Sequence, residues 1–321
     1  ATAPDLRAAA DQIAGRVLRT PLLSVPSLPG ILLKAEHRQR GGSFKARGAA
    51  NAILSAGGVR AIVAGSSGNH GLAVATLGRR LGAAVTVVMA RGADAAKAAA
   101  LTRLGARVLR ADGGVAERDR LAREHAERTG ALLVPSADHE LVVAGAGTVG
   151  LELFADAPDA GTVFVPTGGG GLLAGVCLAA ETLSWQVRVV GVEPAAGRRY
   201  ARSLAAGRPV RIPPPATIAD GLRGQCPGEV PFPIIRRRVD AMVGVTDEAV
   251  RHALDLLRRN GIDAEPSGAV ALAGALDHGF RGRAVVIVSG GNTPAALDHH
   301  PAPADPALDH PALDEPRKET S

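Results

Sequence analysis

One lysine in this chain lies in a setting that suits chemistry. The 321-residue sequence has four lysines and thirty-three arginines, and Lys45 occurs in the segment GGSFKARG, behind two glycines. Most lysines simply lie solvated at a protein surface. A lysine that is desolvated or close to other cations can lose its proton and act as a nucleophile, which an arginine cannot do. We therefore take Lys45 as a candidate nucleophile whose amine could form a Schiff base.

A run of four glycines forms the second candidate. It follows the apolar stretch TVFVP and precedes the helix-like stretch LLAGVCLAA. Glycines before a helix expose backbone amides to an anion, although a tight structural turn would have the same composition. The run has neither the Lys-Ser/Thr ending of a nucleoside-triphosphate loop nor a dinucleotide fingerprint. We interpret it as a site for one small phosphate, formed by Gly168, Gly169, Gly170 and Gly171.

Two further polar turns also follow apolar, strand-like stretches. SSGNHG spans residues 66–71 and SGGNT spans residues 289–293. One polar residue suffices to cap a helix, whereas the first turn gathers four. In a doubly wound sheet, ligands bind beyond the carboxyl ends of the strands. We expect these turns, the glycine run and Lys45 to face one site.

The elements that must position these residues form an alternating pattern. Strand-like stretches separated by helical ones indicate βαβ units and parallel sheets. The sequence thus predicts an α/β fold with two doubly wound parallel-sheet domains. The large domain would comprise residues 1–60 and 139–300, the small domain residues 61–138, and residues 301–321 a flexible C-terminal tail rich in Pro, Asp and Ala. Strands are expected at 61–65, 85–90, 107–111, 131–135, 162–166, 186–194, 241–245 and 284–289.

Composition excludes several classes of function. Hydrophobic residues make up 46% and charged residues 21%, as in soluble globular proteins, and no apolar run approaches the length of a membrane span. The N-terminal segment lacks a signal pattern, and two distant cysteines do not suggest disulfides, so we expect a cytoplasmic protein. The net charge of +6 is scattered and aromatic residues are 2%, which disfavours nucleic-acid binding.

The ordered motifs resemble a known family. KAEHRQRGGSFKARGAANAI, SSGNHG, VPTGGGGLLAG, GVEP, TIADGL, EPSGAVALA and SGGN follow the order of the fold-type II pyridoxal 5′-phosphate enzymes, in the serine/threonine dehydratase and serine racemase branch. The resemblance covers about residues 10 to 295. It implies a tryptophan synthase β-like fold, pyridoxal 5′-phosphate as cofactor and an amino acid as small-molecule substrate. Members of this family are commonly homodimers, so we expect a homodimer.

The resemblance also implies roles for individual residues. Lys45 would carry the cofactor, Phe44 would pack on its pyridine ring, and Asn69 would hydrogen-bond its phenolic oxygen. The phosphate would lie on Gly168 to Gly171 with the amide of Leu172, and Ser289 would meet the pyridine nitrogen. The substrate would be bound by Ser66, Ser67, Asn69 and His70.

This residue set favours β-elimination as the reaction. A serine hydroxyl at the pyridine nitrogen does not stabilise a protonated ring as a carboxylate would, so the cofactor is a weaker electron sink and prompt loss of a β-leaving group is favoured. Lys45 would remove the Cα proton. The expected products from serine, threonine or a bulkier β-hydroxy amino acid are a 2-oxo acid and ammonia.

Two other activities remain open at this stage. Ser67 occupies a position where racemases of this branch place a second acid–base group, opposite the lysine, so Lys45 and Ser67 together would permit racemisation or a dual activity. The third alternative is a β-replacement synthase in specialised metabolism. Release of ammonia and 2-oxo acid separates elimination from racemisation, and a requirement for an external nucleophile marks replacement.

The sequence departs from the family pattern at a few positions. Gly41, Leu72 and Ala137 stand where relatives usually have other residues bordering the substrate, which leaves room for a bulkier or less polar side chain. The family's divalent cation site usually uses the Glu of the EP motif, here Glu193, and an acidic residue six positions later. That position is Arg199, whose guanidinium would repel a cation and could pair with Glu193. We predict no metal there.

Overall fold

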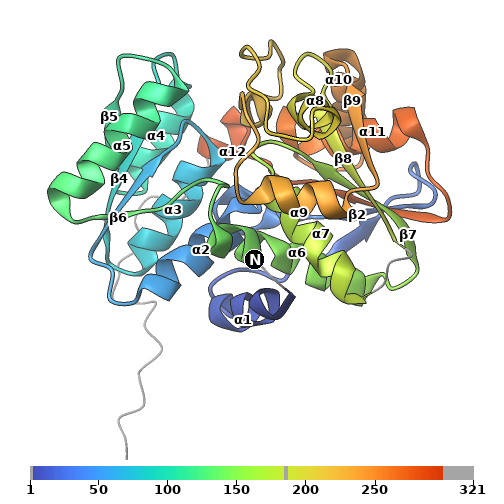
Figure 1. The fold of residues 1–321 in the computed structure, drawn as a ribbon, viewed down its shortest axis with the longest axis horizontal. Coiled ribbons are helices and arrows are strands. Elements are labelled where there is room, and N and C mark those ends of the chain that lie inside the picture. The colour runs from blue at the N-terminus through green and yellow to red at the C-terminus, as the bar shows by residue number, and fades with distance from the viewer. Residues whose placement is uncertain (1–2, 184–186, 299–321) are drawn as a thin grey trace, which may run out of the picture.

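Two separate sheets with covering helices form the framework of the protein in this computed structural model. The small sheet with α3, α4 and α5 lies on the left of Figure 1, the larger sheet with its helices on the right, and α2 lies between them. The structure describes residues 3–183 and 187–298. The tail predicted at 301–321 lies outside these described residues.

The larger sheet has six strands in the order β1-β2-β10-β7-β8-β9. β1 pairs antiparallel with β2, and the remaining neighbours are parallel. The α/β fold predicted from the alternating pattern is confirmed, while the strands β1 and β2 were not expected. The strands are β1 (Leu22–Ser24), β2 (Ile31–Lys34), β7 (Ala160–Pro166), β8 (Arg188–Pro194), β9 (Ala241–Val245) and β10 (Arg283–Ile287).

Helices cover both faces of this sheet. One face packs on α1 (Ala3–Ile13), α6 (Glu140–Asp156), α7 (Gly171–Leu183) and α9 (Pro231–Arg238). The other packs on α10 (Asp247–Arg259) and α11 (Pro266–His278). The helix α8 (Arg199–Ala205) follows β8, and three short 3₁₀ turns lie at η1 (Glu36–Arg38), η2 (Arg40–Gly42) and η3 (Asp220–Leu222).

The side chains of the central strands alternate between two hydrophobic cores. Val163 and Val165 of β7 belong to the core beneath α6 and α7, whereas Phe164 belongs to the core beneath α10 and α11. β10 alternates in the same way, with Val285 on the first face and Val286 on the second. Successive residues of a strand point to opposite faces, so a run of Val and Phe supplies both cores at once.

The smaller sheet is parallel, with the order β5-β4-β3-β6. Its strands are β3 (Ala61–Gly65), β4 (Ala84–Met89), β5 (Arg107–Arg110) and β6 (Leu132–Leu133). Its neighbouring helices are α2 (Lys45–Ala56), α3 (Asn69–Arg80), α4 (Ala95–Arg103), α5 (Val115–Thr129) and α12 (Pro294–Asp298). The core between this sheet and α2 to α4 also includes Ile13, Val142 and Leu297, from outside residues 61–138. The division into the two predicted domains therefore stays a prediction.

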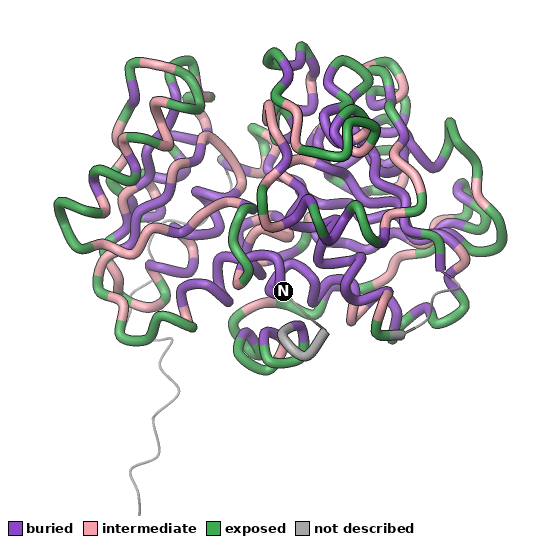
Figure 2. The backbone as a smooth tube through the Cα atoms, in the orientation of Figure 1, coloured by how far each residue is buried: buried purple, intermediate pink, exposed green. Residues whose placement is uncertain are grey.

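Burial follows the two sheets. Figure 2 shows buried segments running through the strands and the helices that face them, with exposed segments at the turns and outer helices. Among the described residues, no helix is both long and apolar enough to cross a bilayer.

A buried ion network fixes α2, the helix that begins with Lys45. Arg47 is fully buried and donates to both oxygens of Glu36 at 2.9 and 2.7 Å, and to Glu152 of α6 at 2.7 Å. Lys34 of β2 donates to Glu152 at 2.7 Å and to the carbonyl oxygen of Thr20 at 2.6 Å. These bonds join α2, α6 and β2, and Arg47 at their centre is two residues after Lys45. Paired, hydrogen-bonded charges are tolerated inside a protein, whereas removal of one partner leaves the other uncompensated.

We expect Arg47→Ala to lower the free energy of unfolding by about 3–5 kcal/mol, because Glu36 would remain buried and charged without its partner. Urea titration followed by circular dichroism measures this change. The matched control is Arg120→Ala on α5, which removes an exposed arginine whose ion pairs with Glu117 and Glu124 are solvated, and should leave unfolding almost unchanged. Equal stability of the two variants would contradict this account of the network.

Candidate active site

The GGSFK segment lies against the end of β10. Ser43 forms an isolated antiparallel bridge with Gly290, and the amide of Phe44 donates to the carbonyl oxygen of Ser289 at 3.1 Å. β10 and β7 are adjacent in the sheet, so the turn after β10 and the glycine run after β7 leave the same sheet edge side by side. These contacts bring Lys45 and two of the three predicted turns to one place, and a hydrogen bond between Asn292 and Asn69 joins the SSGNHG turn to them.

The amine of Lys45 is desolvated. Lys45 is the first residue of α2, and its Nζ donates to the carbonyl oxygen of Ser136 at 2.5 Å. Burial, with a smaller contribution from the positive charge of Arg118, lowers the pKa of Lys45 to about 8. A lysine in water has a pKa of about 10.4. Close to neutral pH, an appreciable share of the Lys45 side chains is therefore uncharged and nucleophilic, as the candidate role requires.

The SSGNHG turn connects the end of β3 to the start of α3. The Ser66 hydroxyl accepts the amides of Gly68 at 3.2 Å and Gly71 at 2.9 Å, so it closes the turn on itself. The Ser67 hydroxyl accepts the amide of Ala90 at 3.0 Å, just after β4. Ser66 therefore bonds to backbone amides of the turn and of α3, and Ser67 to the backbone just after β4. The structure does not join Ser67 to the Lys45 amine.

His70 is a buried, neutral imidazole. Its Nε2 lies 2.8 Å from the carbonyl oxygen of Val134. Burial, and then the charge of Lys45, lowers the pKa of His70 to about 3. Because Nε2 faces a carbonyl oxygen, that nitrogen carries the proton as a donor. His70 can therefore orient the loop and accept a hydrogen bond through its other nitrogen, but it does not act as a cation.

Two partners fix the orientation of the Asn69 amide. Its Nδ2 donates to Oε1 of Glu265, and its Oδ1 accepts from Nδ2 of Asn292 at 2.9 Å. Asn292 also donates to the carbonyl oxygen of Gly41 at 2.9 Å. An amide nitrogen has two N–H bonds, so the second N–H of Asn69 is oriented by the first and is available to another acceptor. Sequence reasoning identified Asn69 but missed Glu265 and Asn292.

Glu265 is a buried carboxyl group within this cluster. Burial is the main cause that raises its pKa to about 7, with the nearby Asp220 also raising it. Its Oε2 has no hydrogen-bond partner among the described residues. A Cβ on Gly290 would lie 2.5 Å from Oε1 of Glu265, so only glycine fits beside this carboxyl. The EPSG motif was visible in the sequence. Its pattern did not show whether Glu265 only precedes a helix or also contacts residues of the site.

The glycine run begins α7. Gly170 has a φ of +100°, and a Cβ there would lie 1.9 Å from the Tyr200 hydroxyl. A Cβ on Gly169 would lie 2.8 Å from the Cβ of Ala137. Glycine is therefore required at Gly170 for both conformation and space, and at Gly169 for space. The first amides of a helix have no partner within the helix, and together with the positive end of its dipole they suit an anion.

Three predicted cofactor contacts remain, namely Ser289, Phe44 and Leu172. Ser289 is buried, and its hydroxyl donates to the carbonyl oxygen of Ser267 at 3.4 Å, a long bond that another acceptor could replace. Phe44 is half-buried and packs against the core of the larger sheet. Leu172 is buried in the same core, so its contribution at the glycine run comes from its backbone. The cofactor roles of these residues stay predictions.

The structure differs from two expectations drawn from the sequence. Leu72, expected to border the substrate, is fully buried in the core beneath the small sheet. Arg199 does not hydrogen-bond to Glu193. The Glu193 carboxylate accepts the amides of Tyr200 at 3.0 Å and Ala201 at 3.1 Å and so caps α8, which turns the Arg199 side chain toward backbone carbonyl groups instead.

The prediction that no metal binds at Glu193 stays a prediction. Within residues 3–183 and 187–298, no group of three or more His, Cys, Asp or Glu side chains is arranged to hold a metal ion.

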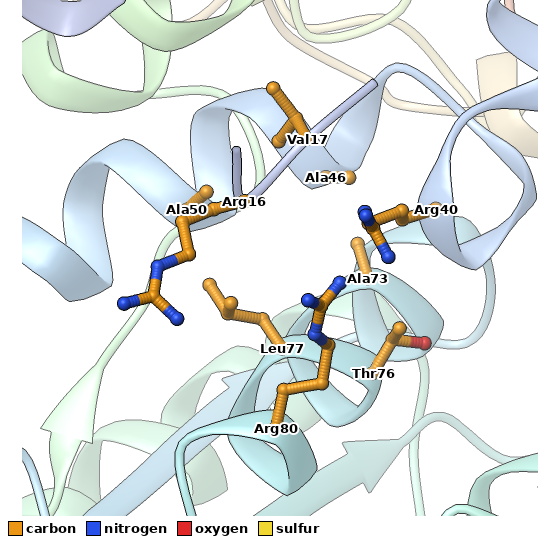
Figure 3. Close-up of a pocket in the computed structure, with 9 residues that line it drawn as sticks. All are labelled: Arg16, Val17, Arg40, Ala46, Ala50, Ala73, Thr76, Leu77 and Arg80. Carbon is orange, nitrogen blue, oxygen red and sulfur yellow. The ribbon is translucent and has the colours of Figure 1, made fainter. Parts of the chain in front are cut away.

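A hollow between α2 and α3 is distinct from the predicted site. Figure 3 shows its lining, which contains none of the predicted catalytic or cofactor-binding residues. Ala46 and Ala50 of α2 face Ala73 and Leu77 of α3 there, so the hollow lies on the packing surface of two helices. The remaining lining residues are Arg16, Val17, Arg40, Thr76 and Arg80.

Comparison with known proteins identifies a family and similar proteins. A family model described as pyridoxal-phosphate dependent enzyme matches residues 13–291. The chain is 36% identical over 304 residues to a serine racemase of Oryza sativa subsp. indica, covering 89% of each. It is 40% identical over 300 residues to an L-threo-3-hydroxyaspartate ammonia-lyase of a Pseudomonas species, covering 90% of this chain and 94% of the relative. A solved threonine deaminase, from T.th., superposes with a TM-score of 0.88 at 43% identity, over 91% of this chain and 99% of that one.

The residues at the site fit the cofactor that this family model names. Pyridoxal 5′-phosphate has an aldehyde, a phosphate, a phenolic oxygen and a pyridine nitrogen. The site offers a desolvated amine on Lys45, a row of glycine amides at the start of α7, an oriented N–H on Asn69 and the Ser289 hydroxyl. The unpartnered oxygen of Glu265 is a further buried polar atom directed into this cluster. Each chemical feature of the cofactor thus has a matching group.

The lowered pKa of Lys45 predicts how its reactivity depends on pH. In the cofactor-free chain, the rate of Lys45 modification by trinitrobenzenesulfonate should rise about tenfold per pH unit and level off above about pH 8, where the amine is already neutral. Nα-acetyl-lysine, the reference amine, should continue to gain reactivity up to about pH 10.4. Peptide mapping at each pH measures the rate at Lys45. Arg118→Gln should move the plateau to higher pH, because it removes a nearby positive charge. A Lys45 profile matching that of the free amine would show that the side chain is solvated.

Proposed function

This chain belongs to the pyridoxal-phosphate dependent enzymes, and from that premise we propose that it is a lyase acting on β-hydroxy amino acids. The reaction removes the β-hydroxyl and the amino group and yields a 2-oxo acid and ammonia. The observation that carries this proposal is the desolvated Lys45 amine, next to the turn after β10 that supplies Ser289. A single base beside a weak electron sink suits elimination.

Lys45 is the group that moves the proton. With a pKa of about 8, its amine can accept the Cα proton of a bound substrate at neutral pH and return it later. The carbonyl oxygen of Ser136 holds the amine in place at 2.5 Å. When bound, the cofactor supplies the electron-withdrawing ring that makes the Cα proton acidic.

Ser289 is the residue that we place at the pyridine nitrogen. A hydroxyl with an ordinary pKa donates a hydrogen bond without transferring its proton. Unlike an aspartate, Ser289 would leave that nitrogen unprotonated, an environment that favours departure of the β-hydroxyl over a long-lived charge at Cα. Asn69, oriented by Glu265 and Asn292, would donate to the phenolic oxygen.

The SSGNHG turn is the proposed substrate carboxylate site. It begins α3, and the amides of Asn69 and His70 at the start of a helix have no partner within the helix, so they suit an anion. Ser66 shapes the turn, and His70 stays neutral, so the carboxylate is bound by backbone dipoles and hydroxyl groups rather than by an ion pair. Such a site recognises the part of the molecule that all amino acids share.

We infer the class of substrate from the substrates that the names of similar proteins specify. The names of similar proteins specify L-threonine, L-threo-3-hydroxyaspartate and serine as their substrates. All three compounds have a hydroxyl on the β-carbon, and we carry this shared feature to the present chain. The homodimer and the cytoplasmic location expected from the sequence stay predictions beside this proposal.

A substrate screen tests the proposed reaction. The cofactor-loaded full chain is incubated with L-serine, L-threonine and the stereoisomers of 3-hydroxyaspartate, and ammonia and 2-oxo acid are measured together. We expect equal amounts of both from at least one compound, and a fall of about 10²–10⁴-fold in Lys45→Ala. Lys318→Ala, outside the described residues, is the matched lysine control and should retain full activity. Turnover that requires an added nucleophile, or ammonia released equally by Lys45→Ala, would contradict the proposal.

Racemisation is the second candidate because Ser67 is a serine next to the proposed carboxylate site. Its hydroxyl oxygen accepts the amide of Ala90, which fixes its position and leaves its O–H free to donate. Chiral chromatography of serine incubated with the enzyme measures any interconversion. If it occurs, Ser67→Ala should abolish it while leaving 2-oxo acid release from one enantiomer. Interconversion that persists in Ser67→Ala would rule out Ser67 as the second acid–base group.

A further inference from the structure

Arg199 is a buried cation directed at backbone carbonyl groups of two loops. Its side chain is fully buried at the start of α8. Nε donates to the carbonyl oxygen of Gly168 at 2.9 Å and Nη2 to that of Thr167 at 2.9 Å. Nη1 donates to the carbonyl oxygens of Leu222 at 2.8 Å and Gly224 at 2.6 Å. One guanidinium thus connects the glycine run with the chain just after η3.

These bonds determine which way the glycine amides point. In a trans peptide, a carbonyl and the N–H of the following residue point in opposite directions. Holding the carbonyls of Thr167 and Gly168 toward Arg199 therefore turns the N–H bonds of Gly168 and Gly169 away from it. The neighbouring Tyr200 extends the pattern, since its hydroxyl donates to the carbonyl oxygen of Gly169 at 2.8 Å and so orients the N–H of Gly170. Two consecutive side chains of α8 thus orient three consecutive amides away from α8.

The positive charge strengthens the same amides as donors. A guanidinium stays charged even when buried, and a peptide whose carbonyl accepts a charged hydrogen bond becomes a stronger donor at its N–H. Burial lowers the pKa of Arg199, and the nearby Glu193 and four carbonyl acceptors offset part of that effect. Glu193 is itself held by two amides of α8, so the cation and its compensating groups are parts of one rigid unit.

We propose that Arg199 is a positioning residue that preorganises the phosphate site of the glycine run. It touches neither cofactor nor substrate. It acts by aiming and polarising the amides of Gly168 and Gly169, while Tyr200 does the same for Gly170. The inference rests on the phosphate-holding role of the glycine run and is independent of which amino acid the enzyme converts.

A comparison of two ligands separates this role from general support of the fold. Pyridoxal 5′-phosphate carries the phosphate, and pyridoxal has the same ring and aldehyde without it. The affinity of the cofactor-free full chain for each is measured by equilibrium dialysis in wild type, Arg199→Met and the matched control Arg202→Met. Arg202 is exposed on the same helix, so its replacement removes an equal charge without touching the loop.

The expected result is selective. Arg199→Met should bind pyridoxal 5′-phosphate about tenfold or more weakly, because the charge-assisted hydrogen bonds that orient the glycine amides are lost. Its affinity for pyridoxal should change little. Guanidinium chloride at millimolar concentration should restore part of the loss in an Arg199→Ala variant. Arg202→Met should match wild type for both ligands.

Three outcomes would overturn the proposal. Arg199→Met could keep its preference for the phosphorylated ligand, it could lose affinity for both ligands by the same factor, or wild type could show no preference at all. If Arg199→Met fails to fold, Arg199→Lys is measured in its place, and a wild-type preference in that variant would also count against it. Absence of amino acid turnover in wild type would refute the proposed lyase activity without affecting this test.

Discussion

The structure depends on lowering the pKa of one amine by burial while keeping carboxylates away from it. The Lys45 side chain is placed at the first position of α2, and its Nζ is given a backbone carbonyl, from Ser136, as its partner. A carboxylate in that place would raise the pKa of the amine, whereas a neutral acceptor leaves the effect of burial in control. Arg118 adds to that effect. The carboxylates near α2 are instead occupied by Arg47 and Lys34, two residues or more away from the amine.

The loops around the amine are held by contacts between backbone and buried polar side chains. Asn69 is set by Glu265 and Asn292, while the glycine run is set by Arg199 and Tyr200. Glycine is required where these side chains approach the chain most closely, as at Gly290 and Gly170. These side chains orient the backbone and amide groups of each loop. Glu265 precedes α11 and Asn292 follows β10, whereas Arg199 and Tyr200 begin α8.

Much of the fold followed from local pattern, and much of the site did not. The apolar stretches that became β3, β4, β7 and β10 were identifiable because a buried parallel strand is a short apolar run between helices. Polar turns after those strands located the candidate residues. The partners of Asn69 could not be found this way, because they lie 196 and 223 positions away in the chain. The hydrogen bonds of the Arg199 guanidinium to backbone carbonyl oxygens were also missed. Every residue has a carbonyl oxygen, so such acceptors leave no pattern in a sequence.

The central claim is that the Lys45 amine joins the cofactor aldehyde, and one measurement tests it directly. The cofactor-loaded chain is reduced with borohydride, digested, and its peptides are searched by mass spectrometry for a pyridoxyl group. Lys34 and Lys97 serve as internal controls, since both are buried but hydrogen-bonded to the carboxylates of Glu152 and Asp220. The account predicts a single modified site at Lys45, and none in Lys45→Ala. Modification at Lys34 or Lys97, or no modification after full loading, would contradict it.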